Sequence, residues 1–152
     1  MKSLKSYIQE KLVIKKNKTT NYKYFPETKK ELKTIIKQRI KTEGNEVNLN
    51  DIDVSNITDM SGLFLGTDFN GDIFAWDVSN VIDMAYMFYG CKLFNCDISS
   101  WDVSNVRNME YMLYGCHSFN RDISSWDVSN VTNNENTFYN CQIEEKYKPR
   151  FK

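Results

Sequence analysis

Apolar residues recur along the chain at an interval that is too long for a single helix or strand. The motif D-V-S-N-[VI] occurs four times, and successive copies begin 24, 25 and 25 residues apart. The copies begin at Asp53, Asp77, Asp102 and Asp127. One missing residue between Gly66 and Phe69 accounts for the shorter first interval. Because the decapeptide DISSWDVSNV also occurs twice unchanged, at 97–106 and 122–131, the chain is predicted to be built from repeats.

The spacing inside one repeat predicts two different segments. In the third repeat, Ile98–Val103 has the L-x-x-L-x-L shape of a leucine-rich repeat, which predicts a short strand. Met109–Leu113 has apolar residues at i, i+3 and i+4, which predicts a short helix or one or two helical turns. The interval lies within the range of about 20 to 29 residues that is typical of leucine-rich repeats. The predicted fold is therefore α/β, a short leucine-rich-repeat-like solenoid of about four coils.

Differences between the repeats indicate a buried core that ends in a polar coil. Trp76 and its two later equivalents replace Ile52 of the first repeat, an apolar exchange that a core position tolerates. In the last repeat, the two methionines of the preceding repeats become Asn134 and Thr137. Terminal repeats have no neighbour on one side, so this polar replacement is typical of a capping coil.

A helix is predicted before the first repeat. Thr28 and Glu31 have the spacing of a capping box, and Gly44 provides a C-terminal stop. The apolar residues between them share one helical face: Leu32, Ile35, Ile36 and Ile40. This helix is expected to cover the open side of the first coil.

The net charge of zero hides a strong asymmetry. Residues 1–46 contain 13 Lys and Arg against 5 Asp and Glu, and residues 47–141 contain 3 against 13. Residues 142–152 contain 4 against 2. We therefore expect three parts: a basic helical N-terminal cap, the solenoid and a basic C-terminal tail. The basic cap leaves open a nucleic-acid-associated function, although the acidic body disfavours nucleic acid as its partner.

The repeats resemble a known family. The pattern F-N-x-D-I-S-x-W-D-V-S-N-V-x-N-M-x-x-M, preceded by T-K-K-E-L-K and NLNDIDVSNITDM, is similar to BspA-type leucine-rich-repeat proteins, including the mycoplasma lipoprotein-repeat group. The resemblance covers about residues 22–141. It implies an interaction scaffold of surface or adhesion type, located at the surface or outside the cell, with no catalytic residues. The N-terminal residues contain no continuous apolar segment of a secretory signal, so a complete chain would be cytoplasmic.

Residue types capable of catalysis or metal binding recur at equivalent positions of the repeats, and no group of them stands apart from the repeat pattern. Cys91, Cys116 and Cys141 stand 25 residues apart, and His117 would add a fourth ligand, but no C-x-x-C pair is present. We therefore expect structural cysteines, no metal, no cofactor and no small-molecule substrate. A calcium ladder on the repeated aspartates is an alternative, although the glycine-rich nonapeptide associated with it is missing. The protein is predicted not to be an enzyme.

Tyrosines form the most distinctive set outside the predicted core. They recur at matching positions beside the methionine face, and tyrosine is enriched at protein interfaces. The alternative is that their rings cover the edges between coils. The predicted protein-binding residues are Tyr86, Tyr89, Tyr111, Tyr114 and Tyr139, with Arg107 at a position that varies between repeats. The predicted function is a non-enzymatic protein-binding scaffold with another protein as its partner; a small intracellular inhibitor with a polyanion-like acidic face is a further alternative. The oligomeric state stays open.

Overall fold

The computed structural model describes Ser3 and residues 21–152. Its regular elements are helix α2, Lys29–Glu43, and the short 3-10 helix η1, Glu145–Tyr147. No strand forms within the described residues, where pairing outside the helices includes five isolated parallel bridges. The described helices are too short or too polar to cross a membrane. The fold thus has one helix near its N-terminus and little other regular secondary structure.

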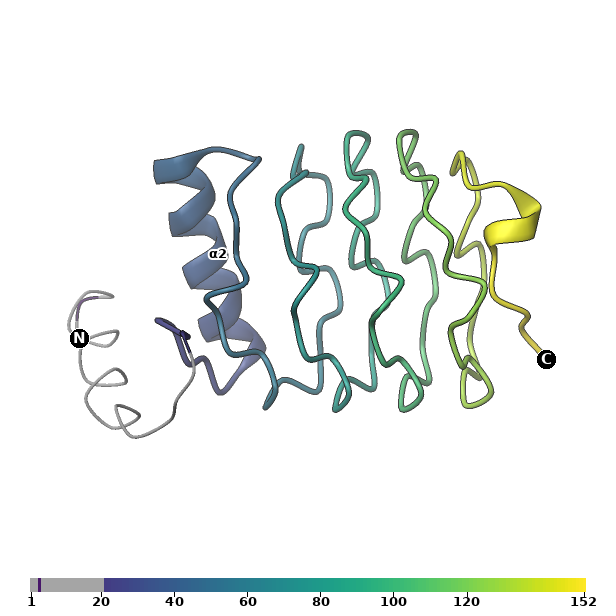
Figure 1. The fold of residues 1–152 in the computed structure, drawn as a ribbon, viewed down its shortest axis with the longest axis horizontal. Coiled ribbons are helices and arrows are strands. Elements are labelled where there is room, and N and C mark those ends of the chain that lie inside the picture. Colours follow the sequence, from purple (N-terminus) through teal and green to yellow (C-terminus); the bar gives the residue numbers. More distant parts are fainter. Residues whose placement is uncertain (1–2, 4–20) are drawn as a thin grey trace.

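Consecutive repeats lie side by side, with equivalent residues paired. Parallel bridges connect Asp59 to Asp83, Asp83 to Asn108, and Asn108 to Asn133. Figure 1 shows the repeats following α2 in order along the long axis of the molecule. The pairing interval of 24 or 25 residues is the interval of the sequence motif. The sequence therefore predicted correctly which residues of neighbouring repeats meet.

Alternate backbone N–H groups connect the methionine segment of each repeat to the next repeat. In the second repeat these groups donate to carbonyls of the third at N···O distances of 2.8–2.9 Å. The pairs are Met84 to Asn108, Tyr86 to Glu110, Phe88 to Met112 and Gly90 to Tyr114. The intervening N–H groups close turns within the repeat, as Met87 does to the carbonyl of Met84. Each segment is thus a run of turns hydrogen-bonded to its neighbour.

The strand predicted at Ile98–Val103 and the helix predicted at Met109–Leu113 are both wrong. The chain turns within the first segment, where the N–H of Trp101 donates to the carbonyl of Ile98 at 3.2 Å. In the second, Tyr111 has a φ of 52°, which an α-helix does not allow. Apolar spacing of i, i+3 and i+4 suits successive turns as well as a helix. The hydrogen bonds that favour turns over a helix are made to another repeat, so the local spacing does not reveal them.

The core is a large cluster of buried side chains in which aromatic rings stack from repeat to repeat. Phe64 and Phe88 have ring centroids 5.5 Å apart, and Trp76 and Trp101 have centroids 6.5 Å apart. The indole Nε1 of Trp101 donates to the carbonyl of Ile73 at 3.2 Å, and the other two tryptophans make the equivalent bond. Because this bond satisfies the one polar atom of the indole, the ring is buried without an unpaired donor.

Polar residues of the motif bind backbone in every repeat. Asp102 accepts hydrogen bonds from the N–H of Ser104 at 3.0 Å and from its Oγ at 2.6 Å. Asn105 donates from Nδ2 to the carbonyl of Ser79 in the preceding repeat at 2.7 Å. These bonds confirm that the repeated Asp is bonded locally, and they show that the Asn joins two repeats.

Helix α2 covers the side of the first repeat. Thr28 Oγ1 accepts from the N–H of Glu31 at 3.2 Å, and Gly44, with a φ of 89°, ends the helix. Both boundaries were predicted. Of the predicted apolar face, three residues are buried and the fourth is partly buried: Leu32, Ile35 and Ile36, then Ile40. Arg39 fixes the helix to the first repeat through Asp51, at 2.8 Å.

The tail after the fourth repeat packs on that repeat. Ile143 is only 5% exposed, and the N–H of Ile123 donates to the carbonyl of Tyr147 at 3.0 Å. Thr137 is buried and its Oγ1 donates to the carbonyl of Met109 at 2.8 Å, whereas Asn134 is exposed. Residues 142–152 therefore pair with the last repeat along one part of its length.

Candidate protein-binding site

The fold brings the five predicted tyrosines together as one tyrosine surface, defined here as Tyr86, Tyr89, Tyr111, Tyr114 and Tyr139. Rings from consecutive repeats stack in two rows. One row pairs Tyr86 with Tyr111 at a centroid distance of 5.1 Å; the other joins Tyr89, Tyr114 and Tyr139 at 4.8 and 5.2 Å. The two rows also contact each other at 5.6–6.2 Å. The result is a continuous aromatic patch on three repeats.

Exposure differs along this patch and is greatest at its C-terminal end. Tyr139 is 60% exposed, while Tyr89 and Tyr114 are half-buried by their neighbours in the row. At the equivalent place in the first repeat stands Leu65, which is 51% exposed. The row therefore continues as an apolar strip onto the first repeat. Large side chains with this much exposed surface are available for contact with another molecule.

Two of the tyrosines are held in a backbone conformation that disfavours them. Tyr86 and Tyr111 have φ values of 57° and 52°, in the left-handed region. Their equivalents are Gly62 in the first repeat and Asn136 in the last, residue types that adopt this region more easily. A left-handed residue with a Cβ costs roughly 1–2 kcal/mol. Gly and Asn adopt the same backbone conformation at the equivalent positions of the first and last repeats. The backbone therefore does not require a tyrosine at position 86 or 111.

Carboxylates flank the phenol groups. Tyr86 Oη donates to Glu110 Oε1 at 3.5 Å, and Tyr111 Oη donates to Glu135 Oε1 at 3.3 Å. Asn136 Nδ2 donates to Tyr111 Oη at 3.0 Å. Partial desolvation, followed by the nearby Glu110 carboxylate, raises the pKa of Tyr86 above its ordinary value. The phenol groups of Tyr86 and Tyr111 therefore lie beside negative charges.

Arg107, predicted together with the tyrosines, lies in a different groove. This shallow groove of about 380 Å3 is lined by asparagines and by residues that follow the motif's last apolar position. Its lining is Asn56, Thr58, Asn80, Ile82, Asn105 and Arg107. Asn80 and Asn105 also donate to the preceding repeat, which fixes the position of these two side chains in the groove.

The cysteines lie where they donate to backbone. Cys91 and Cys116 are buried, and each Sγ donates to a carbonyl of the preceding repeat at 3.0 Å. Burial raises the pKa of Cys91 to about 11 and also raises that of Cys116. Both thiols are therefore protonated and poor nucleophiles at neutral pH. His117 is exposed, and no group of His, Cys, Asp and Glu among the described residues could hold a metal ion.

Sequence reasoning missed four residues that complete the tyrosine surface: Leu65, Glu110, Glu135 and Asn136. A signal for the backbone was present, because Gly62 and Asn136 align with two of the tyrosines. Such an alignment indicates a left-handed position. The glutamates gave no signal, since their equivalents in the first two repeats are Ser61 and Ala85.

Fold and surface together define a repeat protein with a helical N-terminal cap and an exposed aromatic patch. The chain belongs to the family described as Mycoplasma protein of unknown function, DUF285, whose model matches residues 30–149. That range includes all of α2 except Lys29, and all four repeats. Neither a curated protein nor a solved structure matches the chain.

Proposed function

We propose that this protein is a non-enzymatic protein-binding scaffold, a leucine-rich-repeat-like solenoid of BspA type, and that it binds its partner through the tyrosine surface. The repeat interval, the cross-repeat hydrogen bonds and the stacked core rings support the solenoid. Repeats of this kind present extended surfaces whose residues vary without disturbing the core.

The observation that carries the proposal is the left-handed conformation of Tyr86 and Tyr111. A residue held in an unfavourable conformation is kept only when something compensates for its cost. Ring stacking within the row offsets about 0.5–1.5 kcal/mol of the cost of the left-handed conformation. The ends of the array use Gly62 and Asn136 at the same place, so the core does not need tyrosine there. Binding supplies the reason for the rings, because tyrosine offers a large contact area at low entropy cost.

The chemistry of the surface indicates what the partner presents. Tyrosine rings bordered by Glu110 and Glu135 favour a cationic side chain that lies over a ring and reaches a carboxylate. Leu65 and Tyr139 extend the surface with apolar area at its two ends. We therefore propose a partner segment that combines Lys or Arg with apolar or aromatic residues.

Site-specific photocrosslinking tests this proposal. A benzophenone amino acid placed at Tyr139 is expected to form a covalent product with one partner in a lysate of the source cell. The control is the same amino acid at Ser125, which is exposed in the same repeat but lies in the D-I-S-S-W segment. A product at 139 and none at 125 supports the proposal. Equal products at both positions, or none at 139, contradict it.

A second candidate function rests on α2. Lys30, Lys37 and Lys41 are exposed on this helix and pair with no described acidic side chain. Such a stripe favours phosphate contacts and supports the nucleic-acid alternative. Binding to a DNA duplex should then fall steeply between low and moderate salt and weaken further in a Lys30→Glu/Lys37→Glu variant. Absence of binding at low salt contradicts this candidate.

A further inference from the structure

The C-terminal side of the fourth repeat carries a row of backbone donors without acceptors. In each of the first three repeats, four alternate N–H groups donate to the following repeat. The equivalent groups of the fourth repeat belong to Asn134, Asn136, Phe138 and Asn140, and none of them donates to a described residue. We name this row the donor edge. An unpaired edge of this kind is a template for pairing with another chain.

The donor edge offers N–H groups and few acceptors. The carbonyls of Asn134, Asn136 and Phe138 already accept bonds from the N–H groups three residues later. A second copy cannot pair through the same edge, because donors would face donors. The matching acceptor edge of another copy would be its first repeat, where Lys29 of α2 already donates to the carbonyl of Ser61. A different chain that presents a full row of carbonyl oxygens therefore matches the donor edge better than a second copy does.

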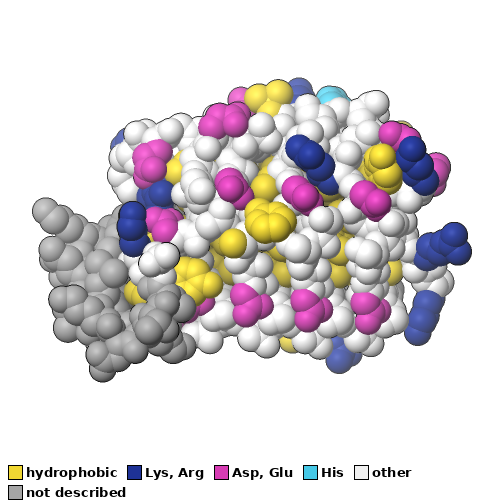
Figure 2. Space-filling view, in the orientation of Figure 1, with side chains coloured by type: hydrophobic (Ala, Val, Ile, Leu, Met, Phe, Trp, Pro, Cys, Tyr) yellow, Lys and Arg dark blue, Asp and Glu magenta, His cyan; other side chains and the backbone are white. Residues whose placement is uncertain are grey.

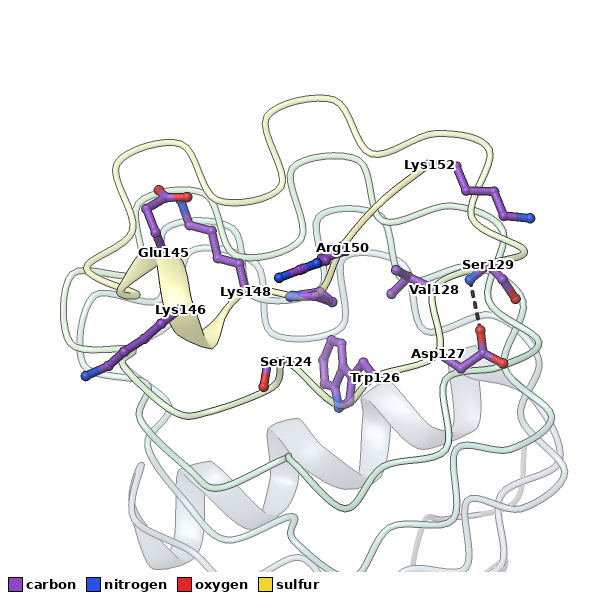
Figure 3. Close-up of a pocket in the computed structure, with 11 residues that line it drawn as sticks. Ser124, Trp126, Asp127, Val128, Ser129, Glu145, Lys146, Lys148, Arg150 and Lys152 are labelled. Carbon is purple, nitrogen blue, oxygen red and sulfur yellow. Dashed lines mark hydrogen bonds and ion pairs between the residues drawn. The ribbon is translucent and has the colours of Figure 1, made fainter.

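Lys and Arg outnumber Asp and Glu in one groove at this end of the molecule. Figure 2 shows Asp and Glu side chains in rows along the stack, and Lys and Arg at the C-terminal end as well as near the N-terminal end. Between the tail and the fourth repeat lies a groove of about 690 Å3, over Trp126 (Figure 3). Its cations are Lys146, Lys148, Arg150 and Lys152. Of these, Arg150 and Lys152 form no ion pair with a described residue.

The groove and the donor edge are parts of one surface. Lys148 lies 5.7 Å from the ring centroid of Phe138, and Phe151 packs on the same ring with centroids 6.2 Å apart. Lys148 and the tail residue Phe151 therefore lie against a donor-edge residue, and the groove that Arg150 and Lys152 line begins at the same tail. Backbone N–H groups carry partial positive charge, so both parts favour the same ligand: oxygen acceptors that bear negative charge.

We propose that the donor edge and the tail cations bind an extended acidic segment of a partner protein, which adds to the fourth repeat as a further strand. In an extended peptide, alternate carbonyls point to the same side, which matches the alternate donors from Asn134 to Asn140. Its Asp or Glu side chains reach Arg150 and Lys152. This site adjoins the tyrosine surface at Asn136 and Tyr139, but its donors are backbone N–H groups and do not depend on the tyrosine rings.

Amide hydrogen exchange followed by NMR tests the proposal on the full chain. In the free protein, the four donor-edge amides should exchange quickly, whereas the bonded equivalents of the third repeat exchange slowly. Those equivalents are Met109, Tyr111, Leu113 and Gly115. A soluble peptide of alternating Glu and Thr should slow the donor-edge amides at least about tenfold, with a peptide of alternating Lys and Thr as the control. The Lys peptide should leave them unchanged.

Charge variants separate strand addition from simple attraction. Arg150→Glu/Lys152→Glu should weaken binding of the Glu peptide at least about tenfold, and Lys92→Glu, exposed on the body, should have little effect. Tyr89→Ser/Tyr114→Ser should leave peptide binding intact even if the proposed function fails. Peptide binding without slower exchange, equal effects of both peptides, no binding, or protection that rises with protein concentration alone would each overturn the proposal.

Discussion

The two halves of each repeat are built on different principles. In the D-I-S-S-W-D-V-S-N half, the motif aspartates accept hydrogen bonds from backbone N–H groups, and Asn80, Asn105 and Asn130 donate to backbone carbonyls of the preceding repeat. Trp101 is 4% exposed with its indole nitrogen bonded. In the methionine half, the backbone makes the cross-repeat bonds, and the tyrosines lie outside the core. Two of them occupy left-handed positions that Gly and Asn fill elsewhere.

This difference shows where the repeat is constrained. Side chains of the first half recur between repeats because they make the same bonds in each repeat, such as the indole bond of Trp101 and the cross-repeat bond of Asn105. In the second half only the backbone bonds and the buried methionine and leucine positions are needed. Residues such as Tyr111 are therefore free to differ, and the choice of a strained tyrosine points to binding.

The largest effect is expected from the first half. Trp101→Ala should lower the free energy of unfolding by about 3–5 kcal/mol, because it removes a buried ring and leaves the carbonyl of Ile73 without its donor. Urea denaturation measures this. Ser100→Ala, at the exposed neighbouring position, is the control and should change stability by less than about 0.5 kcal/mol. A loss below about 1 kcal/mol for Trp101→Ala would contradict the account of the core.

The cross-repeat asparagine should have an intermediate effect. Asn105→Ala should cost about 1 kcal/mol, because it removes the bond from Nδ2 to the carbonyl of Ser79. Asn56→Ala is a matched control, since Asn56 is in the first repeat and its side chain donates to no described residue. Urea denaturation of the two variants should differ by that amount. Equal losses would show that the asparagine acts within its own turn.

A smaller effect is expected from pH. Hydrogen bonds from the side chain and then the backbone of Ser104 hold the pKa of Asp102 below its usual value, and Ser129 does the same for Asp127. A carboxylate whose pKa is lower in the folded state stabilises the fold at pH values above its unfolded pKa of about 3.9. This stabilisation is lost as pH falls through the lower, folded-state pKa. Melting temperature should therefore be flat near neutral pH and decline below about pH 4.

Removing the serine hydroxyls tests the cause of that decline. In Ser104→Ala/Ser129→Ala, the part of the acid decline that comes from these two aspartates should shrink, while Ser100→Ala keeps the wild-type profile. Because the carboxylates are exposed, water screens this contribution and it is small. A steeper decline in the double variant would contradict the assignment.

The smallest effect on stability is expected in the second half. Tyr111→Asn loses ring stacking but relieves the left-handed strain, as Asn136 does at the same place, so stability should change by less than about 1 kcal/mol. Leu113→Asn, two residues away and fully buried, should lose about 3 kcal/mol or more. Thermal unfolding compares them. A large loss for Tyr111→Asn would mean that the ring is part of the core.

Much of the fold could be predicted from the sequence, because its signals are local or periodic. Thr28 and Gly44 bound the helix, and the recurring motif fixes which residues pair. The strand and helix inside each repeat were wrong, because their apolar spacing also fits turns whose hydrogen-bond partners lie 24 or 25 residues away. The tyrosines could be grouped from their spacing, but neither their strain nor the flanking glutamates followed from it. The donor edge depends on where the tail packs, which no local pattern encodes.

The most direct test places the benzophenone amino acid at position 139 and compares the crosslinking yield with and without the Tyr111→Asn substitution. The yield is measured at a temperature where the variant is folded. If the tyrosine surface binds the partner while the other half holds the fold, the yield should fall about tenfold, which corresponds to a loss of about 1.4 kcal/mol in binding. An unchanged yield in a stably folded variant would contradict the claim that this surface is there for binding.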